Sequence, residues 1–162
     1  MPVHRPAVAR PSRGFTLIEI LIVVILLGIL AAIVMPTIAD HDDDARRAVF
    51  ERNLIHFRQG LSLYREQYGL RPPDTATGTG PPALATTVDC DAFVRETPLG
   101  GRWDVESNES GVGLAVGVHF DGTGPTRDAA YMAKIDRHID DGDTTTGHFR
   151  EIVAGRFYWV ME

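Results

Sequence analysis

Glu19 is the residue of this sequence whose surroundings most demand a chemical explanation. It is the only ionisable side chain in the run of residues 15–35, which is otherwise apolar or uncharged. Inside a lipid bilayer a carboxylate costs on the order of 2–3 kcal/mol or more, and such residues usually pair with another charge or mark a functional site. Glu19 is therefore predicted to mark a functional site. The simpler alternative is a side chain that snorkels to the membrane surface.

A second group of candidate residues is acidic and lies near the carboxyl end. Asp136, Asp140, Asp141 and Asp143 surround Gly142, and closely spaced carboxylate oxygens are ligands that Ca²⁺ prefers. The stretch lacks the regular spacing of an EF-hand loop and its terminal Glu. We therefore expect an acidic, solvated turn without a cofactor, and a calcium site is the alternative.

Other chemistry finds little support in the sequence. It contains no Gly-x-Ser-x-Gly, no HExxH and no Cys–His pair, so we expect no enzyme and no catalytic residue. The formal net charge is −6, and the only basic cluster beyond residues 1–14 is Arg46–Arg47. This balance argues against nucleic acid as a partner, because phosphate binding needs clustered Lys and Arg. Cys90 is the single cysteine, so it has no partner for an internal disulfide.

The element that carries Glu19 has the length of a membrane span. The run 15–35 has 21 residues, and about 20 apolar helical residues cross a bilayer core. Three arginines precede the run and four aspartates follow it within residues 40–44. The positive-inside bias therefore predicts a cytoplasmic leader and an exported remainder. A secretory signal peptide cut near residues 30–32 is an alternative, although its apolar core should have only about 7–15 residues.

The string from Arg13 to Pro36, RGFTLIEILIVVILLGILAAIVMP, resembles the amino-terminal segment of type IV pilins and of type II secretion pseudopilins. In that family a prepilin peptidase cuts after a Gly that follows a basic residue. The new first residue is usually a Phe that becomes N-methylated, with a Glu four residues later and a Pro further along. The resemblance implies a processing site at Arg13, Gly14 and Phe15, methylation of Phe15, and assembly roles for Glu19 and Pro36.

The implied processing has a simple physical logic. Cleavage would leave a positive amine on Phe15, about one helical turn from Glu19. A buried charge is tolerated when it is paired, and the Glu19 carboxylate of one subunit can pair with the Phe15 amine of a neighbour. Such a pair would set the register between subunits. Pro36 either allows the helix to loosen during packing or marks the membrane exit.

Major pseudopilins also have a calcium-binding loop near the carboxyl end, which the acidic group at residues 136–143 resembles.

Beyond Pro36 the pattern predicts an amphipathic helix over residues 37–68. Six large apolar or aromatic residues recur at spacings of 4, 3, 4, 3 and 4, which places them on one helix face. Gly69 and the following Pro72–Pro73 are expected to end the helix. We expect one continuous helix with the membrane half, and a two-stranded coiled coil is the alternative. The six residues are Phe50, Leu54, Phe57, Leu61, Tyr64 and Tyr68.

The remainder predicts a small sheet. Residues 69–100 are rich in Gly, Pro and Thr and are expected to form a variable loop. Beyond them, period-two and β-rich patterns predict four strands, helical spacing predicts one short helix, and Ala154-Gly155 predicts a hairpin turn. The strands are expected at 102–106, 112–120, 148–153 and 156–161, and the helix at 129–139.

The expected fold is α+β, with a long N-terminal helix (a transmembrane half plus an amphipathic half) packed on a small antiparallel sheet of about four strands. The expected division is a leader at 1–14, a transmembrane and assembly helix at 15–36, an amphipathic helix at 37–68, the loop at 69–100, and the sheet with its short helix at 101–162.

The resemblance implies a structural subunit of a pilus or pseudopilus, first of all in type II protein secretion. Its expected place is the bacterial inner membrane, crossed once, with a cytoplasmic N-terminus and a periplasmic globular domain. The implied partners are a prepilin peptidase, other pilin or pseudopilin subunits and the membrane, with no nucleic acid. The alternatives are a minor type IV pilin in adhesion, motility or DNA uptake, and a tethered periplasmic domain that never polymerises.

Overall fold

The computed structural model describes residues 14–122 and 124–161, and for residues 36–40 it describes the backbone alone. Arg13, which the sequence places in the processing site, lies outside the described residues together with residues 1–12 of the leader. The chain divides into two compact units, Met1–Asp42 and Asp43–Glu162.

A single helix, α1, comprises Leu17–Tyr68 and contributes to both units. It has 52 residues and continues through Pro36 without interruption, which confirms the expected continuous helix. Its end is also the expected one. Gly69 has a φ of 67° and donates its N–H to the carbonyl oxygen of Arg65 over 2.8 Å. This left-handed cap suits glycine, which has no Cβ to clash.

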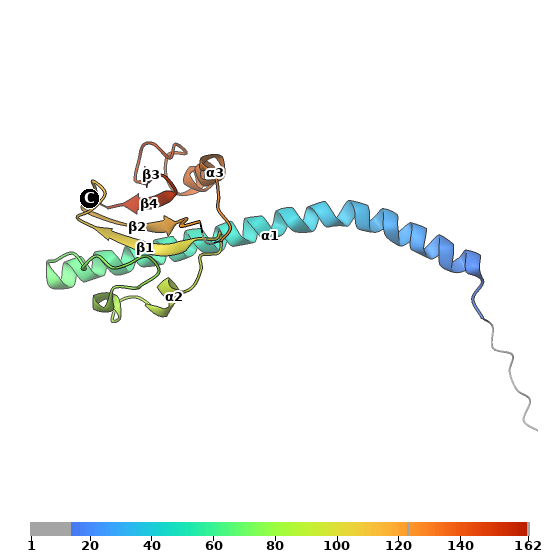
Figure 1. The fold of residues 1–162 in the computed structure, drawn as a ribbon, viewed down its shortest axis with the longest axis horizontal. Coiled ribbons are helices and arrows are strands. Elements are labelled where there is room, and N and C mark those ends of the chain that lie inside the picture. Colours follow the sequence, from blue (N-terminus) through green and yellow to red (C-terminus); the bar gives the residue numbers. More distant parts are fainter. Residues whose placement is uncertain (1–13, 123, 162) are drawn as a thin grey trace, which may run out of the picture. The chain divides into compact units, whose positions relative to one another are not determined.

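The second unit contains a four-stranded antiparallel sheet (Figure 1). Its strands follow the spatial order β1-β2-β4-β3, so the last strand lies between the second and the third. Helix α3 connects β2 to β3, and β3 and β4 form the expected hairpin. All four predicted strands and the short helix are present, with ends shifted by at most two residues. The bounds are β1 Arg102–Ser107, β2 Leu114–His119, α3 Ala129–Ile139, β3 Phe149–Val153 and β4 Arg156–Val160.

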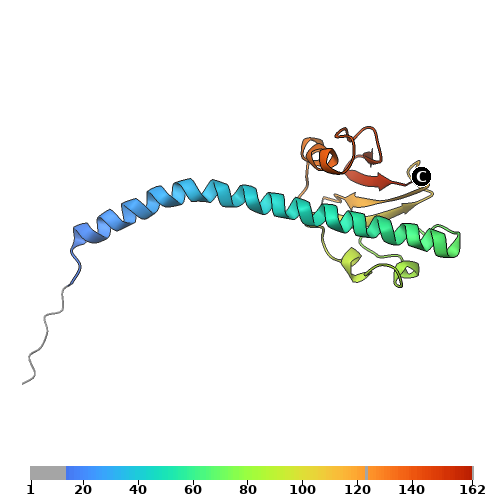
Figure 2. The same cartoon turned by 180° about the vertical axis from the view of Figure 1, so that it is seen from behind.

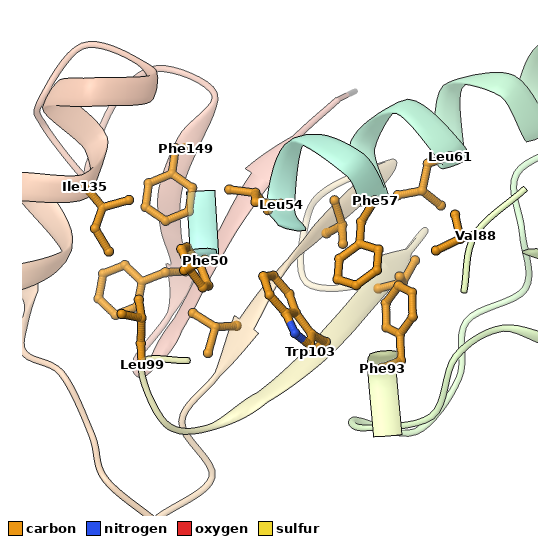
Figure 3. Close-up of a cluster of buried hydrophobic side chains, with 14 of the residues drawn as sticks. Phe50, Leu54, Phe57, Leu61, Val88, Phe93, Leu99, Trp103, Ile135 and Phe149 are labelled. Carbon is orange, nitrogen blue, oxygen red and sulfur yellow. The ribbon is translucent and has the colours of Figure 1, made fainter. Parts of the chain in front are cut away.

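The core of this unit lies between α1 and one face of the sheet, which α1 crosses (Figure 2). Trp103 of β1 lies at its centre, stacked on Phe50 with ring centroids 4.9 Å apart and in edge contact with Phe57 at 4.8 Å (Figure 3). The predicted stripe is buried at its first four positions, which are at most 1% exposed. It then leaves the core, because Tyr64 is half-buried and Tyr68 is exposed.

The segment predicted as a variable loop, 69–100, is a structural part of the core, and the prediction was incomplete there. It contains a short 3-10 helix at Pro82–Leu84 and the helix α2 at Asp91–Val94. Close approach to α1 is possible because Gly60 has no side chain: a Cβ there would overlap Val88. The segment contributes four side chains to the buried hydrophobic core cluster, namely Leu84, Val88, Phe93 and Leu99.

Candidate functional site

The predicted cleavage site lies in exposed chain just before α1. Gly14, Phe15 and Thr16 are not helical, and the Phe15 side chain is 83% exposed. Exposed, irregular chain is where proteases act most readily. A Cβ added at Gly14 would meet nothing within 4 Å. No contact among the described residues therefore requires glycine at this position.

Thr16 and Glu19 form a capping box that starts α1. The backbone N–H and the hydroxyl of Thr16 each donate to Oε2 of Glu19 over 2.7 Å. In return the N–H of Glu19 points to the Thr16 hydroxyl oxygen at 3.3 Å. This reciprocal pattern satisfies backbone donors that the first helical turn leaves without partners. The Glu19 carboxylate also stands at the positive end of the helix dipole.

The apolar surface that follows Glu19 has no cover within the described chain. Residues Leu17–Met35 form 19 residues of α1 that are long and apolar enough to cross a membrane. None of this segment is buried in the structure. A run of this kind needs lipid or other helices around it, because water does not favour so much exposed hydrocarbon.

The predicted acidic group near the carboxyl end is only partly a solvated turn. Asp136, Asp140 and Asp141 bring carboxylate oxygens within 4.8 Å of one another. Asp136 is 0% exposed, and neither of its carboxylate oxygens has a hydrogen-bond partner among the described residues. The expectation of a solvated turn was therefore wrong for Asp136, which lies on the buried face of α3 beside Met132 and Ile135.

The surroundings of Asp136 oppose its ionisation. Burial, followed by the nearby charges of Asp141 and Asp140, raises its pKa to about 6. The other members of the group are held by the loop itself. Asp140 accepts the backbone N–H groups of His148 and Phe149 at the start of β3. These bonds fix the loop, whereas the buried Asp136 oxygens lie near the Asp141 side chain and the Gly142 backbone without a well-formed hydrogen bond.

Asp143 stands apart from the three-carboxylate group. Its side chain accepts the N–H of Thr145 over 3.0 Å and the Thr145 hydroxyl over 2.7 Å. Asp141 accepts the N–H of Asp143 over 2.9 Å and the Thr146 hydroxyl over 2.8 Å. These hydrogen bonds lower the pKa of both exposed carboxyl groups. Of the four predicted aspartates, the structure thus brings three together and places the fourth in a local turn.

A polar cluster on the outer face of the sheet was missed by the sequence analysis. The Tyr158 hydroxyl donates to Asp104 Oδ2 over 2.6 Å, and the Thr77 hydroxyl donates to the same oxygen over 3.2 Å. Arg156 forms an ion pair with Glu106, although both carboxylates of β1 are buried. Alternation along β1 could have revealed them, since Trp103 and Val105 occupy the opposite face. All these carboxylates have protein partners, so the cluster is a structural one.

Two features that the sequence analysis missed differ in whether the sequence alone could have revealed them. The spacing Thr-x-x-Glu before an apolar run is a sequence signature of a capping box, so the pairing of Thr16 with Glu19 could have been inferred. The burial of Asp136 could not, because it depends on the packing of α3.

Cys90 is half-buried, and burial raises the pKa of its thiol. A raised pKa lowers the fraction of thiolate, which is the reactive form of cysteine.

Comparison with known proteins supports the family resemblance that the sequence analysis found in residues 13–36. The family model of the prokaryotic N-terminal methylation motif matches residues 9–35. The type II secretion system core protein G of Klebsiella pneumoniae is 32% identical over 90 residues, which are 56% of this chain and 62% of that protein. The protein of the same name from Klebsiella michiganensis is 31% identical over 106 residues, covering 59% of this chain and 74% of that protein.

The fold is also that of a solved pilin. The structure of the major type IV pilin PilA1 from Clostridium difficile has a TM-score of 0.51 to this chain, at 18% sequence identity, and covers 73% of this chain and 95% of the pilin. At that identity the likeness concerns the fold. Taken with the capping box at the start of an exposed apolar helix and with the matched relatives, it establishes the family. This chain belongs to the type IV pilin-like family that includes the pseudopilins of type II secretion systems.

Proposed function

We propose that this chain is a non-enzymatic, structural subunit of a membrane-anchored pseudopilus in type II protein secretion. A prepilin peptidase cuts it after Gly14, the new amino terminus at Phe15 is methylated, and the subunit polymerises with copies of itself or with other pseudopilins. The observation that carries the proposal is the arrangement at the start of α1: an exposed Gly14–Phe15 bond, a capped Glu19, and an apolar helix that nothing in the described chain covers.

Glu19 can exchange its partners during assembly. In the single chain its carboxylate is satisfied by Thr16. After cleavage, the amine of Phe15 on a neighbouring subunit offers a full positive charge, and a charge-assisted hydrogen bond is roughly twice as strong as a neutral one. The exchange would occur where water is excluded, so the pair would favour one register between subunits over others. The exposed surface of Leu17–Met35 would be covered by lipid before assembly and by neighbouring helices after it.

The same features support a single crossing of the bacterial inner membrane. The arginines before the apolar run favour a cytoplasmic leader. Aspartates 42–44 follow the span, and acidic side chains resist transfer through the bilayer core. The globular unit would then lie in the periplasm. No nucleic acid is needed in this role, which agrees with the acidic net charge of the chain.

Intact mass and amino-terminal sequencing of the protein from membranes test the processing. With an active prepilin peptidase, the chain should begin at Phe15 and carry the mass of one added methyl group. Gly14→Val should block the cut. Gly28→Val is the matched control, because a Cβ at Gly28 also meets nothing within 4 Å. An intact Met1, or a cut near residue 32, would contradict the proposal.

The assembly step is tested separately with Glu19. Glu19→Leu should still be cut after Gly14 but should lose fibre formation and export of folded cargo, because no acceptor remains for the neighbouring amine. Thr16→Val removes the hydroxyl that donates to and accepts from Glu19 but keeps the Glu19 carboxylate, and it is the matched control. Loss of surface pili with normal cargo export would assign the subunit to a type IV pilus instead.

A second proposal is that the loop after α3 binds a calcium ion. It rests on Asp136, a fully buried carboxylate without a partner that lies against Asp140 and Asp141. Ca²⁺ takes six to eight oxygen ligands, and three carboxylates with neighbouring backbone carbonyls and water could supply them. Carboxylates that share one site repel one another when they are ionised. A bound cation would offset this repulsion.

Thermal unfolding of the full chain in detergent tests the calcium proposal. Millimolar Ca²⁺ should raise the midpoint for the unaltered protein and for Asp143→Asn, whose carboxylate lies outside the group. It should have no effect on Asp136→Asn. An unaltered protein whose midpoint does not change between Ca²⁺ and a chelator would refute the site, and an equal response to Mg²⁺ would identify it as unselective for calcium.

A further inference from the structure

A shallow groove opens between α1 and α3 in the second unit. It has a volume of about 180 Å³ and is lined by Leu54, Ile55, Arg58, His138, Ile139 and Trp159. Leu54 forms an apolar floor, while Ile55 of α1 is 39% exposed at the rim. Exposed apolar side chains are unfavourable in water. The groove therefore favours contact with an apolar side chain from another molecule.

The rim of this groove includes one cationic group, the guanidinium of Arg58. The guanidinium of Arg58 lies over the Trp159 ring, 4.3 Å from its centroid, and the Trp159 ring also stacks with the His148 ring, with the centroids 5.3 Å apart. This stack holds the Arg58 charge beside the apolar floor. His138 on the opposite wall lies 3.3 Å from Glu51. The occupant that fits is an apolar side chain with a carboxylate close to it.

A segment with this chemistry is present on α2 of the same unit. Val94 is 69% exposed. This is the highest exposure among the large apolar side chains that the structure describes in the second unit. Asp91 lies three residues earlier in the helix, and residues three apart share a helix face. Asp91 and Asp89 are both exposed. The segment Asp89–Val94 thus presents an apolar tip with carboxylates beside it.

The groove and this segment lie at opposite edges of the sheet. Helix α2 contacts β1 and α3 contacts β3, and β1 and β3 are the two edge strands (Figure 1). One copy therefore cannot fill its own groove with its own α2. A contact between two different surfaces of identical subunits is heterologous, and when it does not close into a ring it produces a helical filament.

We propose that the groove lined by Leu54, Ile55, Arg58 and Ile139 receives residues 89–94 of a second copy of this chain, with Val94 on the apolar floor and Asp91 at Arg58. This contact rests on the proposed fibre function and adds a lateral interface between globular units to the helical one. It is directional, because each copy presents its α2 segment to one neighbour and its groove to the other.

Disulfide trapping in membranes that contain the assembly machinery tests the contact. In a Cys90→Ser background, Val94→Cys combined with Ile55→Cys on one chain should yield a ladder of oligomers on oxidation. Coexpressed chains that each carry one of the two cysteines should stop at dimers. Val153→Cys with Ile55→Cys is the matched control, because Val153 is also an exposed valine of this unit, and it should give no ladder.

Charge reversal tests the pairing of Asp91 with Arg58. Asp91→Lys alone and Arg58→Glu alone should each lower the trapped fraction about tenfold, and the two changes together should restore it. Asp91→Lys is the more informative single variant, because Arg58→Glu also disturbs the stack on Trp159. Failure of the double variant to recover, while both single variants lose trapping, would overturn the pairing.

Formaldehyde crosslinking of the protein without added cysteines separates this contact from the proposed fibre. If oligomers that depend on Glu19 form but the cysteine pair gives no ladder, the groove contact is wrong and the fibre function stands. If the cysteine at Val94 is trapped on a different protein, the occupant is not a second copy and the inference is overturned. If no oligomer forms by either method, both proposals fail.

Discussion

The two parts of α1 satisfy their apolar side chains in opposite ways. From Leu17 to Met35 no side chain is buried by the described chain. From Phe50 to Leu61 the stripe is at most 1% exposed, because the sheet and residues 84–99 cover it. Both parts have the same backbone conformation. One helix can therefore have one surface that packs against its own domain and another that is available to lipid or to neighbouring subunits.

The largest expected effect contrasts one buried and one exposed position of α1. Phe57→Ala should destabilise the second unit by about 3–5 kcal/mol, because it removes an aromatic side chain from contact with Trp103 and Phe93. Leu26→Ala in the span should change the unfolding of that unit by less than about 0.5 kcal/mol. Urea unfolding of the full chain in detergent, followed by Trp fluorescence, measures both. Equal effects would contradict the independence of the two surfaces.

Asp136 should give the next largest effect, and only in the second unit. Its pKa of about 6 lies above the unfolded value near 3.8, so the folded state binds its proton more tightly. The unfolding free energy should therefore fall as pH rises from about 4 to about 7, by about 3 kcal/mol at most. Asp136→Asn should lack this loss. Unfolding in a chelator at several pH values measures the difference, and parallel curves for both proteins would refute it.

Tyr158 tests whether the outer face of the sheet contributes stability through polar contacts. Tyr158→Phe should cost about 1.5–3 kcal/mol, because the buried Asp104 carboxylate loses its closest donor. Val160→Ala on the same strand and face is the control for packing. Burial raises the pKa of the Tyr158 hydroxyl above the ordinary tyrosine value of 10.0, so ultraviolet titration should lose its most alkaline transition in Tyr158→Phe. A neutral Tyr158→Phe would mean that water replaces the hydroxyl.

The smallest expected effect is at the start of α1. Thr16→Ala should destabilise the first turn by about 0.5–2 kcal/mol, because it removes the hydroxyl that exchanges hydrogen bonds with Glu19. Thr16→Ser should preserve it. Amide hydrogen exchange at Leu17 and Ile18 in detergent measures the change, while unfolding of the second unit should not respond. Unaltered exchange in Thr16→Ala would show that Glu19 holds the turn through the backbone N–H alone.

The sequence by itself determined the elements whose pattern is local. The stripe from Phe50 to Leu61, the helix at 129–139 and the strands could be predicted, because the helical period and strand alternation report which residues share a face. The apolar run with Glu19 indicated a span and its family. The processing residues Gly14 and Phe15 remain predictions, since the structure shows an accessible bond and not its cleavage.

Only the tertiary structure decided the features that depend on contacts between distant residues. The segment 84–99 has no periodicity, so its burial against α1 followed from the close approach at Gly60 and not from any local pattern. Asp136 is buried because α3 packs its inner face on the core, and no spacing among the aspartates reveals that. The placement of β4 between β2 and β3 likewise brings Tyr158 to Asp104, a pairing across 54 positions of sequence. Periodicity describes one element at a time, whereas burial and charge pairing are properties of elements packed together.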